Sequence, residues 1–398
     1  MINTMSSETV KDSDLPSSHA WIYPESSDAE RVRRWHNVRK LMVQSDLDCL
    51  LIPGSDANQL NAAKNVQYIS NYVTYSGRTY VIFPADESKE AFLSLGHPEG
   101  GVPHQRYVPA RYHSWIRTMS ATENQGQEVI GHVKKIGLDR SKIGIVDPQL
   151  FPAPFYDAFR RAMPEAKLEI ASRILTSLRA VLSDEEISML KEAARILDLS
   201  YEAAIETARP GIKECELWGE IEKVIIGNGG FMGHANLITS FRKPSFPMSP
   251  PSHRILEEGD TIIAETSSIW AGYTAQIAYA FSLGEPEKEL VKMHSLCSNL
   301  YDEAISMFND GKPYKEVKQL LDKEVRDAGY LPMTPQVHLD LGEQDERVKP
   351  GQNFVLHPCA VTKDYHFGMK IGDHIVVDKS EKARSVMKTP HDFRALSA

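Results

Sequence analysis

Cysteine and long apolar runs are both scarce in this sequence. The four cysteines lie far apart along the 398 residues: Cys49, Cys215, Cys297 and Cys359. No two of them form a C-x-x-C pair, which argues against a zinc–thiolate site, a dithiol redox centre and a dense disulfide framework. No apolar run approaches the roughly 20 residues that cross a bilayer, and residues 1–24 lack the basic and apolar segments of a signal peptide. We therefore predict a cytoplasmic protein with reduced thiols and no membrane partner.

Positive charge is also in short supply, because 45 lysines and arginines face 54 aspartates and glutamates and leave a net charge of -9. Non-specific binding to nucleic acid relies on clustered Lys and Arg side chains that neutralise phosphates. We therefore expect no nucleic-acid partner for a chain whose isoelectric point is near 5.9. Hydrophobic residues at 41% and charged residues at 25% are typical of globular proteins and fit an enzyme as well as a binding module.

The length leaves room for two domains, and the sequence pattern divides accordingly. Residues 1–28 are rich in Ser, Asp and Glu without periodicity, so we predict a mobile N-terminal arm. Residues 29–178 alternate helical and strand patterns, including an apolar run at 47–52 that predicts a buried strand. We predict an α/β domain here and a second domain at 179–398.

The second domain begins with a helix signal and then repeats its own order. Ser183 and Glu186 have the spacing of a capping box, so a helix is predicted from this point to the Pro–Gly stop at 210–211. A shorter helix and strand patterns follow, and the order of helix, helix and strands recurs from Leu290 onward. We therefore predict an internally duplicated domain of α/β (α+β) class.

Three segments resemble the creatinase/prolidase family, whose catalytic domain has the pita-bread fold. Residues 259–265, followed by 272–273 and 280–284, are similar to the family's strand pair with its GD, GY and closing Gly signatures. Residues 348–358 are similar to L-x-PGM-x-F-x-x-EP, and the helix start at Ser183 is similar to S-x-x-EI-x-x-M-x-x-A. The resemblance implies a creatinase-N-like α/β domain followed by a pita-bread domain with pseudo-twofold duplication.

The resemblance also implies where the peptidases of that family would hold their metals, and there this sequence departs from the pattern. Those enzymes bind two divalent ions with two Asp, one His and two Glu, because a cation pair needs several anionic oxygens. The matching positions here are, in order, Glu265, Gln276, Pro335 or a neighbour, His357 and Gly372. One carboxylate is too little negative charge for two cations, so we predict no metal and no other cofactor.

In character the sequence is most similar to the metal-free family members creatinase and ectoine hydrolase, which cleave small non-peptide C–N bonds. Ectoine-hydrolase-like sequences also have a Glu at the position of Glu265, and creatinase-like sequences have an x-G-R element that 76–78 resembles. In those relatives the Arg enters the pocket of the partner subunit, so the resemblance implies a homodimer in which Arg78 crosses the interface. The position of their proton-shuttling His is Met248 here, with His234 and His253 as nearby substitutes.

Glu265 and His357 are the predicted catalytic pair. A carboxylate in an apolar central strand is costly unless it is paired or functional, so Glu265 is expected to act as general base or nucleophile, the alternative being a residual salt bridge. His357 follows an apolar run and is expected to donate a proton to the leaving nitrogen or to hydrogen-bond a substrate carbonyl, the alternative being a satisfied core histidine. The predicted substrate-binding residues are Arg78, Tyr273, Gln276, His374, His234 and His338, and His366 and Met248 are expected only to line the pocket.

Several functions fit these residues. The leading hypothesis is a metal-independent hydrolase that cleaves a non-peptide C–N bond (amide, amidine or guanidine) of a small carboxylate-bearing metabolite. One alternative retains a single zinc or iron ion on Glu265, His357 and His374, in a hydrolase or an aminopeptidase-like enzyme. The others are a lyase that abstracts a proton through Glu265, and a non-catalytic ligand-binding or interaction remnant of the fold.

Overall fold

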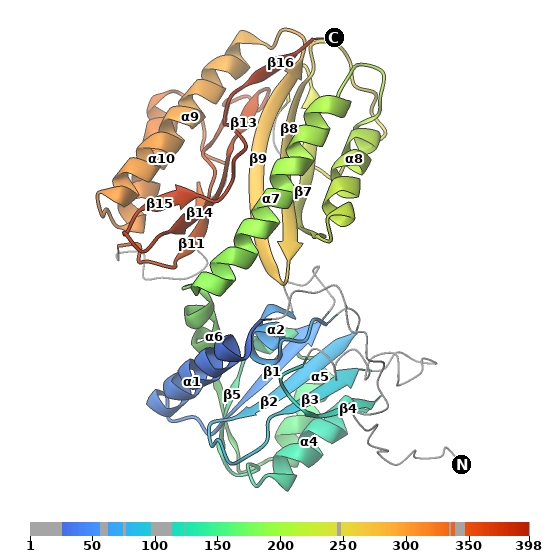
Figure 1. Cartoon of the computed structure of the whole chain (residues 1–398), viewed down its shortest axis with the longest axis vertical. Helices are drawn as coiled ribbons and strands as arrows, with labels where there is room; N and C mark the ends of the chain where they lie inside the picture. The colour runs from blue at the N-terminus through green and yellow to red at the C-terminus, as the bar shows by residue number, and fades with distance from the viewer. Residues whose placement is uncertain are drawn as a thin grey trace.

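The computed structural model describes most of the chain in two units, each with its own sheet (Figure 1). The described residues are 26–55, 63–74, 77–96, 114–122, 124–244, 248–333, 336–338 and 347–397, and for 234–236 and 338 they comprise the backbone alone. Nearly all of the predicted mobile arm therefore lies outside the described residues. The first described helix is α1 (Asp28–Gln44), which Ser27 caps by accepting a hydrogen bond from the amide of Glu30.

The first unit is built on a six-stranded sheet with the order β4-β3-β2-β1-β5-β6. Side chains of β1 (Cys49–Ser55) alternate between two apolar clusters, with Leu50 and Ile52 in one and Cys49 and Leu51 in the other. A strand that is covered on both faces explains why its sequence is continuously apolar. The other elements of this unit are α2 (Lys64–Ser70), β2 (Arg78–Pro84), β3 (Phe92–Gly96), β4 (Thr118–Thr122), α4 (Gln125–Lys135), β5 (Lys142–Ile145), η3 (Pro148–Leu150), α5 (Ala153–Ala162), β6 (Lys167–Ile170) and α6 (Ser172–Arg179).

The second unit is built on an eight-stranded sheet that begins with the order β10-β11-β14-β9-β8-β7 and adds β15 beside β14 and β16 beside β9. Its first helix starts at the predicted capping box, in which the amide of Glu186 donates to Ser183 Oγ and the amide of Ser183 donates to the Glu186 carboxylate. The elements are α7 (Asp184–Thr207), α8 (Glu214–Gly227), β7 (Phe231–Phe241), β8 (Thr261–Trp270), β9 (Tyr273–Leu283), α9 (Lys288–Asn309), α10 (Tyr314–Asp327), β10 (Val337–His338), β11 (Asn353–Leu356), β12 (Cys359–Val361), β13 (Gly368–Lys370), β14 (Gly372–Val377), β15 (Ala383–Ser385) and β16 (Arg394–Leu396).

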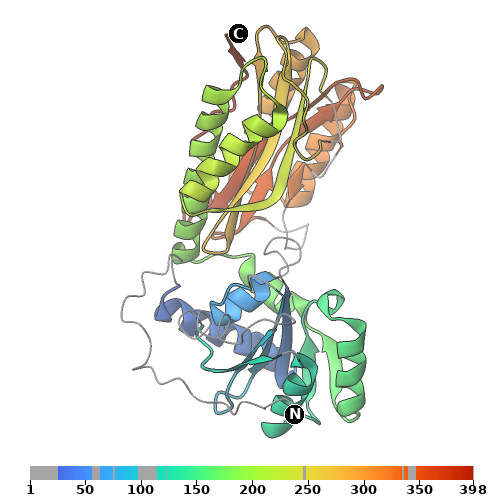
Figure 2. The same cartoon turned by 90° about the vertical axis from the view of Figure 1, so that its right-hand side faces the viewer.

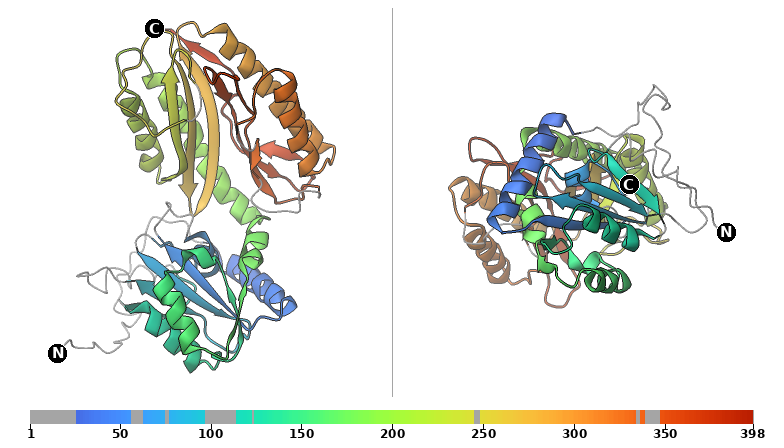
Figure 3. Two further views of the ribbon diagram at one scale, coloured as in Figure 1. Left: turned by 180° about the vertical axis from the view of Figure 1, so that it is seen from behind. Right: turned by 90° about the horizontal axis from the view of Figure 1, so that it is seen from below.

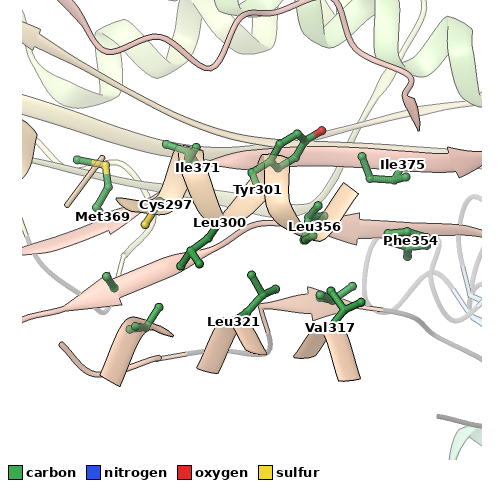
Figure 4. Close-up of a cluster of buried hydrophobic side chains, with 14 of the residues drawn as sticks. Cys297, Leu300, Tyr301, Val317, Leu321, Phe354, Leu356, Met369, Ile371 and Ile375 are labelled. Carbon is green, nitrogen blue, oxygen red and sulfur yellow. The ribbon is translucent and has the colours of Figure 1, made fainter. Parts of the chain in front are cut away.

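The predicted internal duplication of the second unit is confirmed. Helices α7 and α8 pack with β7, β8 and β9 in one apolar cluster, and α9 and α10 pack with β11 and β14 in another (Figure 3). Figure 4 shows the second cluster, where Leu300, Val317 and Leu321 from the two helices lie beside Leu356 of β11. Each helix pair therefore covers its own half of one continuous sheet, as the fold class predicted from the resemblance requires.

The long helices are amphipathic. In α7, Leu190, Leu197 and Tyr201 are buried, whereas Lys191 and Arg195 are exposed. Within the described ranges, no helix combines the length and the apolar character needed to cross a membrane. The cytoplasmic location stays a prediction.

A partly buried ion network, the junction network, joins the two units, which lie one above the other in Figure 2. It consists of Glu30, Arg33 and Arg34 of α1, Glu186 of α7 and Tyr273 of β9. The Arg34 guanidinium donates to the Tyr273 hydroxyl at 2.7 Å, and that hydroxyl donates to the Glu186 carboxylate at 2.8 Å. Arg33 donates to the other oxygen of Glu186 at 2.8 Å. The capping residue Glu186 thus also ties the first unit to the second.

Candidate active site

The centre of the large sheet brings together residues that are far apart in the sequence. Glu265 of β8 pairs with Ala278 of β9, and Ala278 in turn pairs with Gly372 of β14. β11 pairs with β14 up to Leu356, so His357 follows directly in the same row across the sheet. Directly opposed residues of antiparallel strands face the same side of a sheet. The pairing therefore aims Glu265 and His357 at one another.

The predicted catalytic pair is assembled in this row. His357 Nε2 lies 3.6 Å from Glu265 Oε1, and both side chains are buried. The His357 amide donates to the carbonyl of Gln336 at 2.9 Å, while the Gln336 side chain bonds to the amide and carbonyl of Cys359. These contacts fix the backbone on both sides of His357, so its ring is held at the end of β11 beside the carboxylate.

Gln276 joins the pair from β9. Its side-chain amide donates to Glu265 Oε1, and Gln276 is itself buried. The sequence predicted Gln276 as a substrate-binding residue, and the structure places it in direct contact with the predicted base. A neutral amide at this place orients the carboxylate without adding charge.

Lys370 is the member of the cluster that the sequence did not predict. Its Nζ lies 2.6 Å from Glu265 Oε2, and the residue is 4% exposed. The signal in the sequence was a single charged residue between the apolar Met369 and Ile371, in a segment predicted to lead into a strand. A buried lysine needs a counter-charge, and only the packing of β13 against the large sheet shows that Glu265 supplies it. We call Glu265, Gln276, His357 and Lys370 the central cluster.

The other predicted site residues lie elsewhere or are only partly described. Tyr273 belongs to the junction network, where burial raises the pKa of its hydroxyl well above the usual value although Arg34 opposes the shift. His374 Nε2 bonds to Asn353 Oδ1 at 3.0 Å, and Arg78 is exposed at the start of β2. His234 and His338 lie in β7 and β10, and their side chains are outside the described residues.

The residues expected to line the pocket or to replace a proton shuttle are also dispersed. Met248 packs in the apolar cluster that α9 and α10 form with the large sheet. His366 is exposed and lies 3.3 Å from Asp364, and His253 is exposed as well. Within the described residues, the polar contacts of the Glu265 carboxylate are with Gln276, His357 and Lys370, and neither His253 nor His366 is among them.

The described residues do not fit a pair of metal ions. Among them, no group of three or more His, Cys, Asp or Glu side chains is placed to hold a metal. Gly372 has a φ of 134°, and a Cβ added there would overlap the carbonyl oxygen of Leu356, so no ligand side chain fits at this position. Both oxygens of Glu265 are already bonded, one to Lys370 and one to Gln276.

The alternative of a single metal fails the same test within the described residues. It requires Glu265, His357 and His374 around one ion, whereas the ring of His374 bonds to Asn353 and no such three-ligand group is found. A carboxylate, an imidazole, an ammonium and an amide in a buried site are instead suited to proton transfer and to the stabilisation of a developing negative charge.

Comparisons with known proteins match both units. The model of metallopeptidase family M24 matches residues 188–379, and the model of the creatinase/prolidase N-terminal domain matches residues 34–181. An uncharacterized hydrolase/peptidase of Sinorhizobium fredii is 23% identical over 76% of this chain and 78% of its own length. An Xaa-Pro dipeptidase of Pyrococcus horikoshii is 21% identical over 70% of this chain and 76% of its own length.

Solved structures share the fold over nearly the whole chain. The prolidase of Pyrococcus horikoshii superposes with a TM-score of 0.74 at 19% identity, covering 92% of this chain and 99% of the prolidase. The X-Pro aminopeptidase of Thermotoga maritima superposes with a TM-score of 0.76 at 16% identity, covering 91% and 99%. The predicted architecture, a creatinase-N-like domain before a pita-bread domain, is confirmed by these matches.

These comparisons correct the leading functional hypothesis. A metal-independent hydrolase of non-peptide C–N bonds is wrong, because the relatives with a named reaction are Xaa-Pro peptidases and the matching family model is that of metallopeptidases. The coarser prediction of a hydrolase is supported. The comparisons favour the aminopeptidase-like alternative, while a special likeness to creatinase or ectoine hydrolase stays a prediction.

Proposed function

We propose that this chain, which belongs to the creatinase/prolidase family by both of its units, hydrolyses the peptide bond of short peptides. The observation that carries the proposal is the buried pair of Glu265 and His357 in the row across the central strands. Dipeptides that end in proline are the first candidate substrates, because Xaa-Pro dipeptidase and X-Pro aminopeptidase are the named activities of similar proteins.

The residues of the central cluster supply each proton movement that this reaction needs. The Glu265 carboxylate takes a proton from a water molecule as the water oxygen forms a bond to the peptide carbon, and the carbonyl electron pair moves to the oxygen. When the intermediate collapses, the C–N bond breaks and the nitrogen takes a proton from the His357 imidazolium. The 3.6 Å separation lets protonated Glu265 return its proton to His357. Amide and water are thereby converted to acid and amine.

Among the described residues, those at the positions where this family's metallopeptidases bind a metal pair do not form such a site, so the proton transfers above belong to Glu265 and His357. In relatives that hold such ions, metals activate the water and polarise the carbonyl. In this chain Glu265 is bonded to Lys370 and Gln276, and Gly372 has no room for a ligand side chain.

The test is an assay of the purified chain against a panel of dipeptides, with and without C-terminal proline, followed by mass spectrometry of the products. Glu265→Gln is expected to lower kcat by about 1,000-fold, because general acid–base groups contribute about 100- to 10,000-fold. The matched control is Glu214→Gln, since Glu214 is another buried carboxylate of the same unit that binds Ser240 and the amide of Ser252.

His357 has its own matched control. His357→Asn is expected to lower kcat by about 100-fold through loss of the proton donor. His294→Asn changes a second buried histidine, which stacks on Phe393 away from the central cluster, and is expected to leave kcat unchanged. Hydrolysis that survives Glu265→Gln, or a wild-type protein that releases no amino acid from any dipeptide, contradicts the proposal and leaves the lyase and the non-catalytic remnant.

A further inference from the structure

Lys370 has more donors than described acceptors. A lysine ammonium carries three N–H groups, and among the residues that the structure describes Glu265 Oε2 is the one acceptor it contacts. With 4% of the residue exposed, water has little access to the remaining two N–H groups. A buried donor without an acceptor is costly, so these groups are a ready binding site for an oxygen atom of a ligand.

A purely structural pair is the competing explanation. Buried ion pairs contribute little net stability, because the desolvation of both charges offsets their attraction, and apolar replacements are often neutral. Ile263, Ala278 and Ala280 lie on the same face of the sheet as Glu265, so an apolar pair would have apolar neighbours there. Stability alone therefore gives a weak reason for Lys370, and its place beside the base gives a stronger one.

We propose that Lys370 is a catalytic residue that binds the carbonyl oxygen of the scissile bond and stabilises the oxyanion formed there. This inference rests on the function proposed above and adds a residue that neither the sequence pattern nor the comparisons assign. When water attacks the carbon, the carbonyl electron pair moves to the oxygen, and the new negative charge lies against the Lys370 ammonium. No proton leaves Lys370 in this step, and the charge is neutralised again when the C–N bond breaks.

In this site the Glu265 carboxylate is the base and also holds the Lys370 ammonium. Glu265 Oε2 holds Lys370 on the side of the oxyanion, while Glu265 Oε1 lies towards Gln276 and His357. In a water-poor site a preformed cation acts more strongly than in water and needs no reorganisation when charge develops. The geometry thus gives each oxygen of Glu265 a separate partner.

The role of Lys370 is tested by measurements of binding, which do not depend on turnover. The probe is the phosphinic analogue of alanylproline, in which an anionic tetrahedral phosphinate replaces the peptide carbonyl. The control ligand is the isostere in which an apolar CH₂–CH₂ link replaces the peptide bond. Titration calorimetry should show that the Kd for the phosphinate is about 10- to 100-fold higher for Lys370→Met than for the wild type, as expected for loss of a charge-assisted hydrogen bond. The Kd of the apolar isostere should change less than about twofold.

Two further variants keep the test decisive if Lys370→Met folds poorly because Glu265 is left without its counter-charge. Glu265→Gln and Glu265→Gln/Lys370→Met differ only in the lysine, and the same selective loss of phosphinate affinity is expected between them. Arg254→Met removes a different cation, which pairs with buried Asp260, and should leave both affinities unchanged.

The outcomes separate this inference from the proposed function. Equal affinity of the phosphinate for wild type and Lys370→Met, or an equal loss for both probes, overturns the role of Lys370 while dipeptide hydrolysis can stand. Failure of the wild type to bind either probe and to hydrolyse any dipeptide overturns the proposed function itself. A selective loss for the phosphinate together with a kcat lowered about 100-fold supports both.

Discussion

The junction network and the central cluster are both buried and both charged, yet they differ in how fully their donors are used. In the junction network the guanidinium of Arg34 contacts Glu30, Tyr273, Ser26 and the carbonyl of Tyr68, at distances between 2.7 and 3.3 Å. In the central cluster, within the described residues, the ammonium of Lys370 contacts one carboxylate. The first arrangement is complete in itself, whereas the second leaves donors for a ligand.

In this chain, a structural charge and a functional charge differ in how many of the donors have acceptors. A polar network whose partners are all present rigidifies the contact between elements, and each member is costly to remove. A buried ion pair with spare donors is a poor stabiliser but a good binding site. Burial is similar in the two places, since Arg34 is 2% and Lys370 4% exposed, so burial alone does not distinguish them.

The largest difference is expected when each cation is removed in turn and the free energy of unfolding is measured in urea. Arg34→Met leaves buried Glu30 and Glu186 short of a counter-charge and is expected to cost about 4 kcal/mol. Lys370→Met is expected to cost less, because one pair is lost and Gln276 still donates to Glu265. In the folded Arg34→Met protein, kcat for dipeptide hydrolysis should match that of the wild type.

The double variants sharpen that result. Lys370→Met/Glu265→Gln removes both charges of the central pair and should recover most of the lost stability. Arg34→Met/Glu30→Gln should stay destabilised, because the Tyr273 hydroxyl loses its guanidinium donor and Glu186 keeps Arg33 but loses Arg34. Equal recovery in the two double variants would show that both clusters are simple ion pairs and would remove the distinction.

A glycine in each region gives the next largest effect. Gly372 in the central row and Gly272 beside the junction network both have positive φ, 134° and 86°. A Cβ at Gly372 would overlap the backbone oxygen of Leu356, whereas one at Gly272 would meet the end of the Gln67 side chain, which can turn away. We expect Gly372→Ala to lower the free energy of unfolding by about 3 kcal/mol and Gly272→Ala by about 1 kcal/mol.

Thermal unfolding followed by circular dichroism checks this pair of variants. Equal losses of stability would mean that the backbone at Leu356 moves aside as easily as the Gln67 side chain does. Gly372→Ala with wild-type stability would also reopen the possibility of a ligand side chain at this position, and with it the fit to a metal pair.

The sequence predicted those features of the two regions that depend on local pattern. The capping box of Ser183 and Glu186 is a contact between residues three positions apart, and it was predicted and is confirmed. The second role of Glu186, which binds Arg33 and Arg34, depends on contacts across more than 150 residues. Sequence spacing carries no information about such contacts, so the junction network was not predicted.

The central cluster shows the same limit. Glu265 was identified because a carboxylate in an apolar strand is unusual, and His357 because it replaces an expected ligand. Lys370 was missed because its significance appears only when the fold brings its Nζ to within 2.6 Å of Glu265, 105 residues away, and Tyr273 was assigned to the substrate although it lies on the strand end that meets α1. Residue types point to chemistry, but strand pairing decides which of them share a site.

The smallest expected effect is a pH dependence confined to the junction network. Burial alone would raise the pKa of Glu30, but hydrogen bonds and attraction from Arg33 and Arg34 lower it from 4.5 to about 2. A carboxyl group with a lowered pKa in the folded state stabilises the protein above its unfolded value of 4.5, and this stabilisation is lost as the pH falls towards 2. The Tm difference between wild type and Glu30→Gln should therefore be largest at neutral pH and shrink steadily across that acid window.

Asp184→Asn is the control, because its pair with Lys379 is exposed at the surface and contributes little at any pH. A Tm difference for Glu30→Gln that stays constant from neutral pH to pH 2 would mean that the charge of Glu30 does not hold Arg33 and Arg34 in place for their contacts with Glu186 and Tyr273.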